Sequence, residues 1–194
     1  MIDSSSAAER ALSLLRRAGA QDVAHPGGTL LTHLRRVQAR LASWQARPVL
    51  QLAGLCHASY GTDGFPTALL PLDRRAELVA AIGAEAEAVV YLYAACDRKA
   101  TYPGLGEPDA VFHDRFTGRT LVPQAQSRRD FVELSAANEL DLAHEDLAFR
   151  AAHGPDLLAF FTRVRHLLGP AAWHDCRTLL AAPPAPARRP GSIP

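Results

Sequence analysis

Apolar residues recur along most of the chain at the three- and four-residue spacing of amphipathic helices. Residues 29–44 place leucine, valine and tryptophan side chains on one helical stripe. Residues 48–60 are apolar on nearly every side and open with a proline, which predicts a central, buried helix. Together these features predict an all-α helical bundle, with further helices in residues 6–19, 74–83, 84–98, 127–150 (broken near His144), 155–169 and 171–180.

Glycine and proline interrupt this helical pattern. Residues 60–66 hold two glycines and a proline directly after the buried helix, which predicts a turn. Residues 101–125 hold more of both, and alternation around Thr117 predicts a small hairpin there. Residues 182–194 are proline-rich with almost no apolar side chain, so we expect a disordered tail after a single domain of residues 1–181.

Composition narrows the class of protein. A chain of 194 residues with 48% hydrophobic content can bury one sizeable core. A net charge of +1 predicts no nucleic-acid partner, and no apolar run is long enough for a membrane span. Three widely spaced cysteines without a secretory signal indicate reduced thiols and a cytoplasmic location. The many apolar helices also allow a homodimer.

Two of the eight histidines lie in the most strongly patterned helices. His33 is in the middle of residues 29–44, and His57 is late in the buried helix. Two antiparallel helices joined by a short turn can point such residues at each other. Because neutral imidazole is the commonest protein ligand for metals, the pair predicts half of a metal site. The alternative is that each is a core histidine bonded to a backbone carbonyl.

The run His33-x-x-Arg36-Val37 and the run LAGLCH that ends at His57 resemble the HD-domain superfamily. That family has a helical His, then an apolar helix ending in His-Asp, then a late helical Asp. The likeness is closest to hydrolases of the nucleotide ppGpp and covers roughly residues 20–146. It implies an HD-like bundle in which residues 131–143 form the late helix, and it implies metal-dependent chemistry.

The chain departs from the HD pattern at both carboxylates. Ala58 follows the second histidine where the family has Asp, and Asn138 stands where the late Asp is expected. Hard ions such as Mg²⁺ and Mn²⁺ prefer charged oxygen ligands. These departures count against a dinuclear centre and against ppGpp hydrolysis. The dipeptide His113-Asp114 does not replace the motif, because it lies in a Gly/Pro-rich segment instead of ending a buried helix.

Other side chains can complete a mononuclear site. His25 lies in a loop, residues 24–29, just before the helix of His33, and Asp97 ends an apolar helix. With His33 and His57 they would offer one Fe, Zn or Mn ion three nitrogens and one oxygen, with a position left open. The alternatives are a turn role for His25 and a solvent-exposed or Arg98-paired carboxylate for Asp97.

The segment after His57 supplies further candidates. The candidate acid/base or orienting groups are Tyr60, Asp63 and Asp97. The candidate substrate-binding residues are Thr62, Arg98, Asn138 and Arg115, the last from a possible lid loop. Turn chemistry explains Tyr60 and Asp63 equally well. Glu139 is expected to point away from Asn138 on its helix.

Three functional hypotheses follow. The leading one is a metal-dependent HD-like enzyme that acts on a small polar molecule, hydrolytic or otherwise redox-neutral, at a rearranged His-rich mononuclear site. The second is a non-haem iron oxygenase, a class that the HD resemblance also includes. The third is a metal-free HD-like module that binds a ligand or a partner protein. Bound metal separates the first two from the third, and the identity of the metal separates the first from the second.

Overall fold

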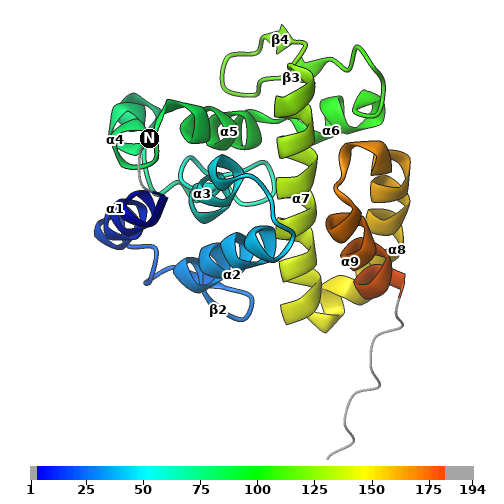
Figure 1. Ribbon diagram of the computed structural model, residues 1–194, viewed down its shortest axis with the longest axis horizontal. Coiled ribbons are helices and arrows are strands. Elements are labelled where there is room, and N and C mark those ends of the chain that lie inside the picture. Colours follow the sequence, from blue (N-terminus) through cyan, green and yellow to red (C-terminus); the bar gives the residue numbers. More distant parts are fainter. Residues whose placement is uncertain (1–3, 182–194) are drawn as a thin grey trace, which may run out of the picture.

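A computed structural model describes residues 4–181 of the chain, and it confirms the mainly α-helical class (Figure 1). The residues expected to form a disordered tail, 182–194, lie outside this description. The longer helices are α1 (Ser4–Arg17), α2 (Leu30–Ser43), α3 (Pro48–Cys56), α4 (Arg75–Ile82), α5 (Ala84–Ala95), α7 (Ala125–Glu145), α8 (Leu147–Arg163) and α9 (Pro170–Ala181). Shorter elements are α6 (Arg98–Thr101), the 3₁₀ turns η1 (Leu72–Arg74), η2 (Tyr102–Gly104) and η3 (Arg165–Leu167), and the strands β1 (Ala24–His25), β2 (Gly28–Thr29), β3 (Phe112–His113) and β4 (Thr120–Leu121).

Helix α7 is the central element of the bundle. It packs against α2, α3 and α5 on one side and against α8 and α9 on the other (Figure 1). Because both sides are covered, its middle is buried even where the sequence is polar, at Asn138, Glu139 and Asp141. Buried polar groups need partners, and this stretch of α7 is therefore a candidate for part of a functional site.

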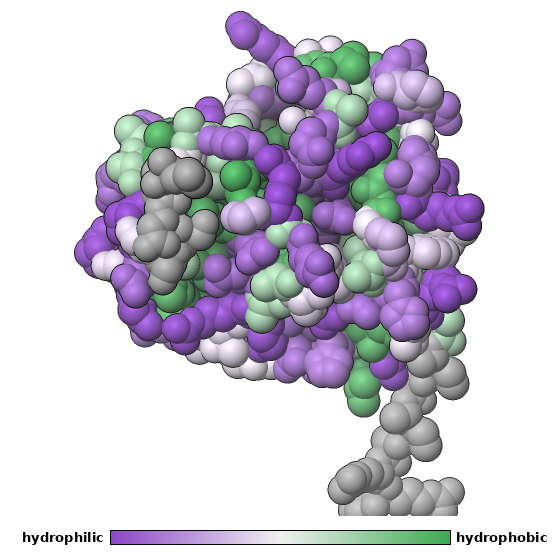
Figure 2. Space-filling view, viewed as in Figure 1, coloured by the Kyte–Doolittle hydropathy of each residue, from purple (hydrophilic) through white to green (hydrophobic). Residues whose placement is uncertain are grey.

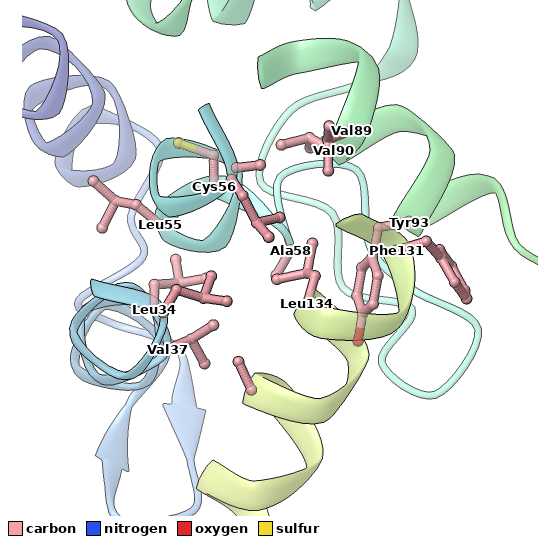
Figure 3. Close-up of a cluster of buried hydrophobic side chains, with 14 of the residues drawn as sticks. Leu34, Val37, Leu55, Cys56, Ala58, Val89, Val90, Tyr93, Phe131 and Leu134 are labelled. Atoms are coloured by element: carbon pink, nitrogen blue, oxygen red, sulfur yellow. The ribbon is translucent and has the colours of Figure 1, made fainter. Parts of the chain in front are cut away.

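The hydrophobic core lies where α2, α3, α5 and α7 meet. Figure 3 shows Leu34, Leu55, Val90 and Leu134, one from each helix, among the side chains gathered there. All four are fully buried. On the face shown in Figure 2, hydrophilic residues cover most of the surface. Among the described residues, no helix is both long and apolar enough to cross a membrane.

Helices α2 and α3 approach each other closely at Gly54. A Cβ atom on Gly54 would collide with the side chain of Leu41, which is fully buried. The Thr29 side chain caps the start of α2 by accepting from the Thr32 amide at 3.3 Å. This close packing holds His33 of α2 near His57, the residue that follows α3.

Replacing Gly54 with alanine should therefore destabilise the protein by about 1–3 kcal/mol, the usual cost of overpacking a core. Urea unfolding of the wild type and the variant measures this loss. Gly104→Ala is the matched control, because nothing lies within 4 Å of a Cβ placed there. Equal stability changes in the two variants would contradict the close approach.

Three local expectations can be compared with the structure. The hairpin expected around Thr117 is confirmed as β3 paired with β4. The prediction that a helix starts at Pro155 is wrong, because α8 begins at Leu147 and runs through that proline. Asp146 caps this start by accepting from two backbone amides, and packing on α7 and α9 holds the helix across the proline. Residues 24–29, taken as a loop, form the β1–β2 hairpin.

Candidate metal centre between α2, α3 and α7

Three acceptor atoms converge at the centre of the bundle. His33 Nε2 lies 3.3 Å from His57 Nε2, and Asn138 Oδ1 lies 3.1 Å from each of them. The three side chains come from α2, the end of α3 and α7, and none is more than 8% exposed. The two histidines face each other across the α2–α3 contact, as their spacing predicted.

Neighbouring groups fix which atoms point inward. His33 Nδ1 donates to Asp141 Oδ2 at 2.6 Å, and His57 Nδ1 donates to the Gly54 carbonyl at 2.8 Å. Each ring therefore turns its Nε2 toward the centre. Asn138 Nδ2 donates to Glu139 Oε1 at 3.3 Å, which turns its oxygen toward the imidazoles. Two imidazole nitrogens and one amide oxygen thus meet at one point, an arrangement that a metal ion could bridge.

The spacing of these atoms suits ligands of one ion. Ligand atoms that lie about 2.1 Å from a metal ion, with tetrahedral or right angles between them at the ion, are about 3.0–3.4 Å apart. The three observed separations are 3.1, 3.1 and 3.3 Å. Two imidazoles and one amide oxygen therefore fit three positions around a single ion.

Burial favours the neutral form of two imidazoles here, those of His57 and His25. Burial, reinforced by the neighbouring His33, lowers the pKa of His57 to about 3. The same two causes lower the pKa of His25 to about 4. Since metal ligands must be deprotonated, such rings are ready to bind at neutral pH.

Asp141 and Arg36 hold His33 in place. Arg36 donates to both carboxylate oxygens of Asp141, at 2.7 and 2.8 Å. Burial opposes ionisation of Asp141, but hydrogen bonds from His33 and Arg36 lower its pKa to about 2. Arg36 also donates to the carbonyls of Pro26 and Gly27, in the turn of the β1–β2 hairpin. One arginine thereby fixes the orientation of His33 and the hairpin that carries His25.

His25 lies beside the site in a stacked arrangement. Its ring packs on that of His33 with centroids 4.0 Å apart and planes at 25°. Its Nδ1 is buried without a hydrogen-bond partner. Within residues 4–181, no three His, Cys, Asp or Glu side chains are grouped as metal ligands. Of the expected set, His25, His33 and His57 line one cavity, whereas Asp97 does not, and Asn138 lies closest to the two facing histidines.

The candidate acid/base groups do not meet at this centre. Asp97 caps α6 by accepting from the Ala100 amide at 3.0 Å. Asp63 accepts from the backbone amide of Arg98 at 3.0 Å, as turn chemistry allows. Tyr60 donates to the buried Glu87 at 2.9 Å instead of facing the histidines. Each hydroxyl or carboxylate has a local partner that explains its position.

Three of the four candidate substrate-binding residues lie beside the two histidines, and the fourth does not. Thr62, Arg98 and Asn138 line a cavity of about 140 Å³ together with His25, His33 and His57. Arg115 does not line it, because its Nε donates to the Ala94 carbonyl and its guanidinium lies over the Phe116 ring.

The sequence did not predict two residues of the site, Glu139 and Arg36. Glu139 was expected to point away, but it lines the cavity and accepts from Arg98 at 3.0 Å as well as from Asn138. The reason is that α7 is enclosed on both sides, so adjacent residues are both buried. Arg36, the other residue, is part of the run His33-x-x-Arg36-Val37 that resembles the HD pattern, but a basic residue is ordinary on a helix surface and was given no role there.

A metal-free sample should lose stability below pH 6.5 because of His57. Its folded-state pKa of about 3 lies below the ordinary 6.5, so protons bind preferentially to the unfolded chain as the pH falls. The loss starts near pH 6.5, reaches about 1.4 kcal/mol per pH unit, and levels off near the folded pKa. Urea unfolding in chelator at pH 7.5, 6 and 5 measures it, and His57→Gln should flatten the slope. An unchanged slope in that variant would contradict the buried neutral ring.

The fold and the site define a mainly helical protein with a buried two-histidine centre. A family model described as a domain of unknown function (DUF6817) matches residues 14–98, which include both histidines and end before Asn138. No curated protein and no solved structure matched the chain.

Proposed function

We propose that the protein is a metal-dependent enzyme of the HD-like kind, acting on a small polar molecule by a hydrolytic or otherwise redox-neutral reaction. The observation that carries the proposal is the convergence of His33 Nε2, His57 Nε2 and Asn138 Oδ1, which lie 3.1–3.3 Å from one another while both Nδ1 atoms have partners elsewhere. The HD resemblance supports it, since these are the positions of its two histidines and its late acidic residue. A bound ion would act as a Lewis acid and lower the pKa of a bound water.

The residues around the ion would each have a defined task. His33 and His57 would bind it through Nε2, and Asn138 through its amide oxygen. Glu139 would keep that oxygen turned inward, because it accepts from the amide nitrogen. Thr62 and Arg98 line the cavity beside the ion and would orient a polar substrate. Arg98 retains donors for this task only in part, since it already donates to Glu139 and Tyr93.

The donor set also favours particular ions. Two imidazoles and a neutral oxygen suit Zn²⁺ or Fe²⁺ better than Mg²⁺, which prefers charged oxygen. We therefore propose one divalent ion per chain, drawn from Fe, Zn or Mn. Metal-reconstituted protein should hydrolyse members of a panel of chromogenic phosphate and carboxylic esters, and His57→Ala should not. Equal background rates in both proteins across the panel would contradict the hydrolytic form of the proposal.

Restoring the two missing carboxylates should shift metal preference. Ala58 and Asn138 both line the small cavity, so Ala58→Asp with Asn138→Asp adds two charged oxygens beside the histidines. We expect Mn²⁺ affinity to rise by about tenfold, which corresponds to about 1.4 kcal/mol. Calorimetric titration measures the affinity. The single variant Ala58→Asn, which keeps Asn138, is the uncharged control. If the double variant binds Mn²⁺ no more tightly than that control, the ion does not bind beside His33, His57 and residue 138.

An iron oxygenase is a second candidate, because a mononuclear site of neutral donors suits iron as well as zinc. Its distinguishing property is a reaction with oxygen that only the Fe²⁺ form supports. Anaerobic Fe²⁺ loading followed by exposure to air, with oxygen uptake recorded, separates it from the redox-neutral enzyme.

A metal-free binding module is the third candidate. The absence of a carboxylate among the three convergent atoms favours it, since hydrogen bonds among these atoms would also account for their separations. It predicts that ions fail to bind and that His57→Ala keeps full function in a folded protein. The cytoplasmic location and the homodimer also remain proposals.

A further inference from the structure

A second and larger cavity adjoins the histidine site. Its volume is about 540 Å³, and its lining shares Arg98, Glu139 and Phe149 with the cavity of the histidines. A volume of this size is typical of sites for small organic molecules. The two cavities therefore adjoin at these three residues, and we call the larger one the outer cavity.

Aromatic and aliphatic side chains form much of the outer cavity. The rings of Tyr102 and Phe160 stack with centroids 4.5 Å apart, and Phe149 and Leu157 lie against the same space. Tyr102, Phe149 and Leu157 are only half-buried, so part of their apolar surface is available to a ligand. Such walls gain free energy by covering an apolar or aromatic group.

The charges of the outer cavity are unequal. The Arg98 guanidinium is offset by Glu139 at 3.0 Å. The remaining charged residues in the lining are Lys99 and Arg163, which are cationic, and Asp156, which is anionic. Two cations against one carboxylate leave an excess of one positive charge, and Lys99 is exposed to solvent at this surface. The lining therefore attracts anions.

We propose that the outer cavity binds an organic anion with an apolar or aromatic body, whose acid group pairs with Lys99 and Arg163. The molecule's other end lies toward His33 and His57, and this part, which makes it the substrate, rests on the proposed function. Binding in the outer cavity itself needs no metal, because none of the three convergent atoms belongs to its lining.

The test uses metal-free protein and a matched pair of probes, the anion 1-naphthylacetate and its neutral isostere 1-naphthylacetamide. Calorimetric titration should show the anion binding about fivefold tighter, the size expected for pairing with exposed cations. Lys99→Glu should remove this preference, and Leu157→Asp should weaken both probes. Arg35→Glu, an exposed charge reversal on α2 outside both cavities, should change neither.

Equal affinity for the two probes, or equal effects of Lys99→Glu and Arg35→Glu, would overturn the proposal. A second measurement links the cavity to the histidines. In Mn²⁺-loaded protein, the ion should broaden the NMR signals of bound 1-naphthylacetate, and the broadening should be absent in His33→Ala/His57→Ala. Bound ion without broadening would overturn the connection. Probe binding with no ion bound by any titration would contradict the proposed function and support the outer cavity as an anion site.

Discussion

Replacing His57 with alanine should lower the affinity of the protein for Zn²⁺ by about 100-fold or more, which is about 2.7 kcal/mol. His57 Nε2 is one of three atoms 3.1–3.3 Å apart that face a common centre. The ring's other nitrogen donates only to the backbone carbonyl of Gly54, so the change removes a ligand without breaking a buried ion pair. Competition titration against a chromogenic chelator measures the affinity.

The matched control for this loss is His144→Ala. That side chain is 64% exposed, so its removal should leave the affinity unchanged. Circular dichroism and urea unfolding of both variants establish that each is folded. Retention of full affinity in a folded His57→Ala protein would exclude the centre as the metal site.

Replacing Asp141 with asparagine should affect both stability and metal binding. The carboxylate accepts from His33 and from two nitrogens of Arg36, and it is 2% exposed. Loss of its charge leaves Arg36 partly buried without that partner, at a cost of about 3 kcal/mol. His33 also loses the group that orients its ring, which typically weakens metal binding 10- to 100-fold.

Urea unfolding and Zn²⁺ titration of Asp141→Asn measure the two effects separately. Asp109→Asn, an exposed aspartate in the segment before β3, is the control and should change neither. An Arg36→Leu/Asp141→Asn double variant should recover part of the stability, because no buried charge is left unpaired, but not the metal affinity. Recovery of both would mean that Asp141 acts through the fold alone.

The sequence predicted the helical class and the meeting of His33 with His57 because both depend on periodicity. Apolar residues at helical spacing define which faces pack, and the helices 29–44 and 48–60 carried the strongest pattern. The separation of 24 residues between the histidines then follows from two helices joined by a short turn.

The partners contributed by α7 were harder to predict. Asn138 was expected to take the late acidic position, but whether it faced the histidines depended on how α7 sits between two groups of helices. Asp97 was expected at the metal site but caps α6 instead, because an aspartate at the end of an apolar helix is equally suited to cap the next helix. Capping is a local interaction that the sequence permits, whereas the choice between capping and a metal site is made by tertiary packing.

Equilibrium dialysis of metal-free, untagged protein against Zn²⁺, Fe²⁺ and Mn²⁺, followed by elemental analysis and X-ray absorption spectroscopy of the loaded sample, tests the central claim most directly. We expect about one ion per chain, coordinated by two imidazoles with oxygen in the remaining positions. No ion retained from any of the three, or coordination that includes a thiolate or lacks imidazole, would contradict a metal centre at His33, His57 and Asn138.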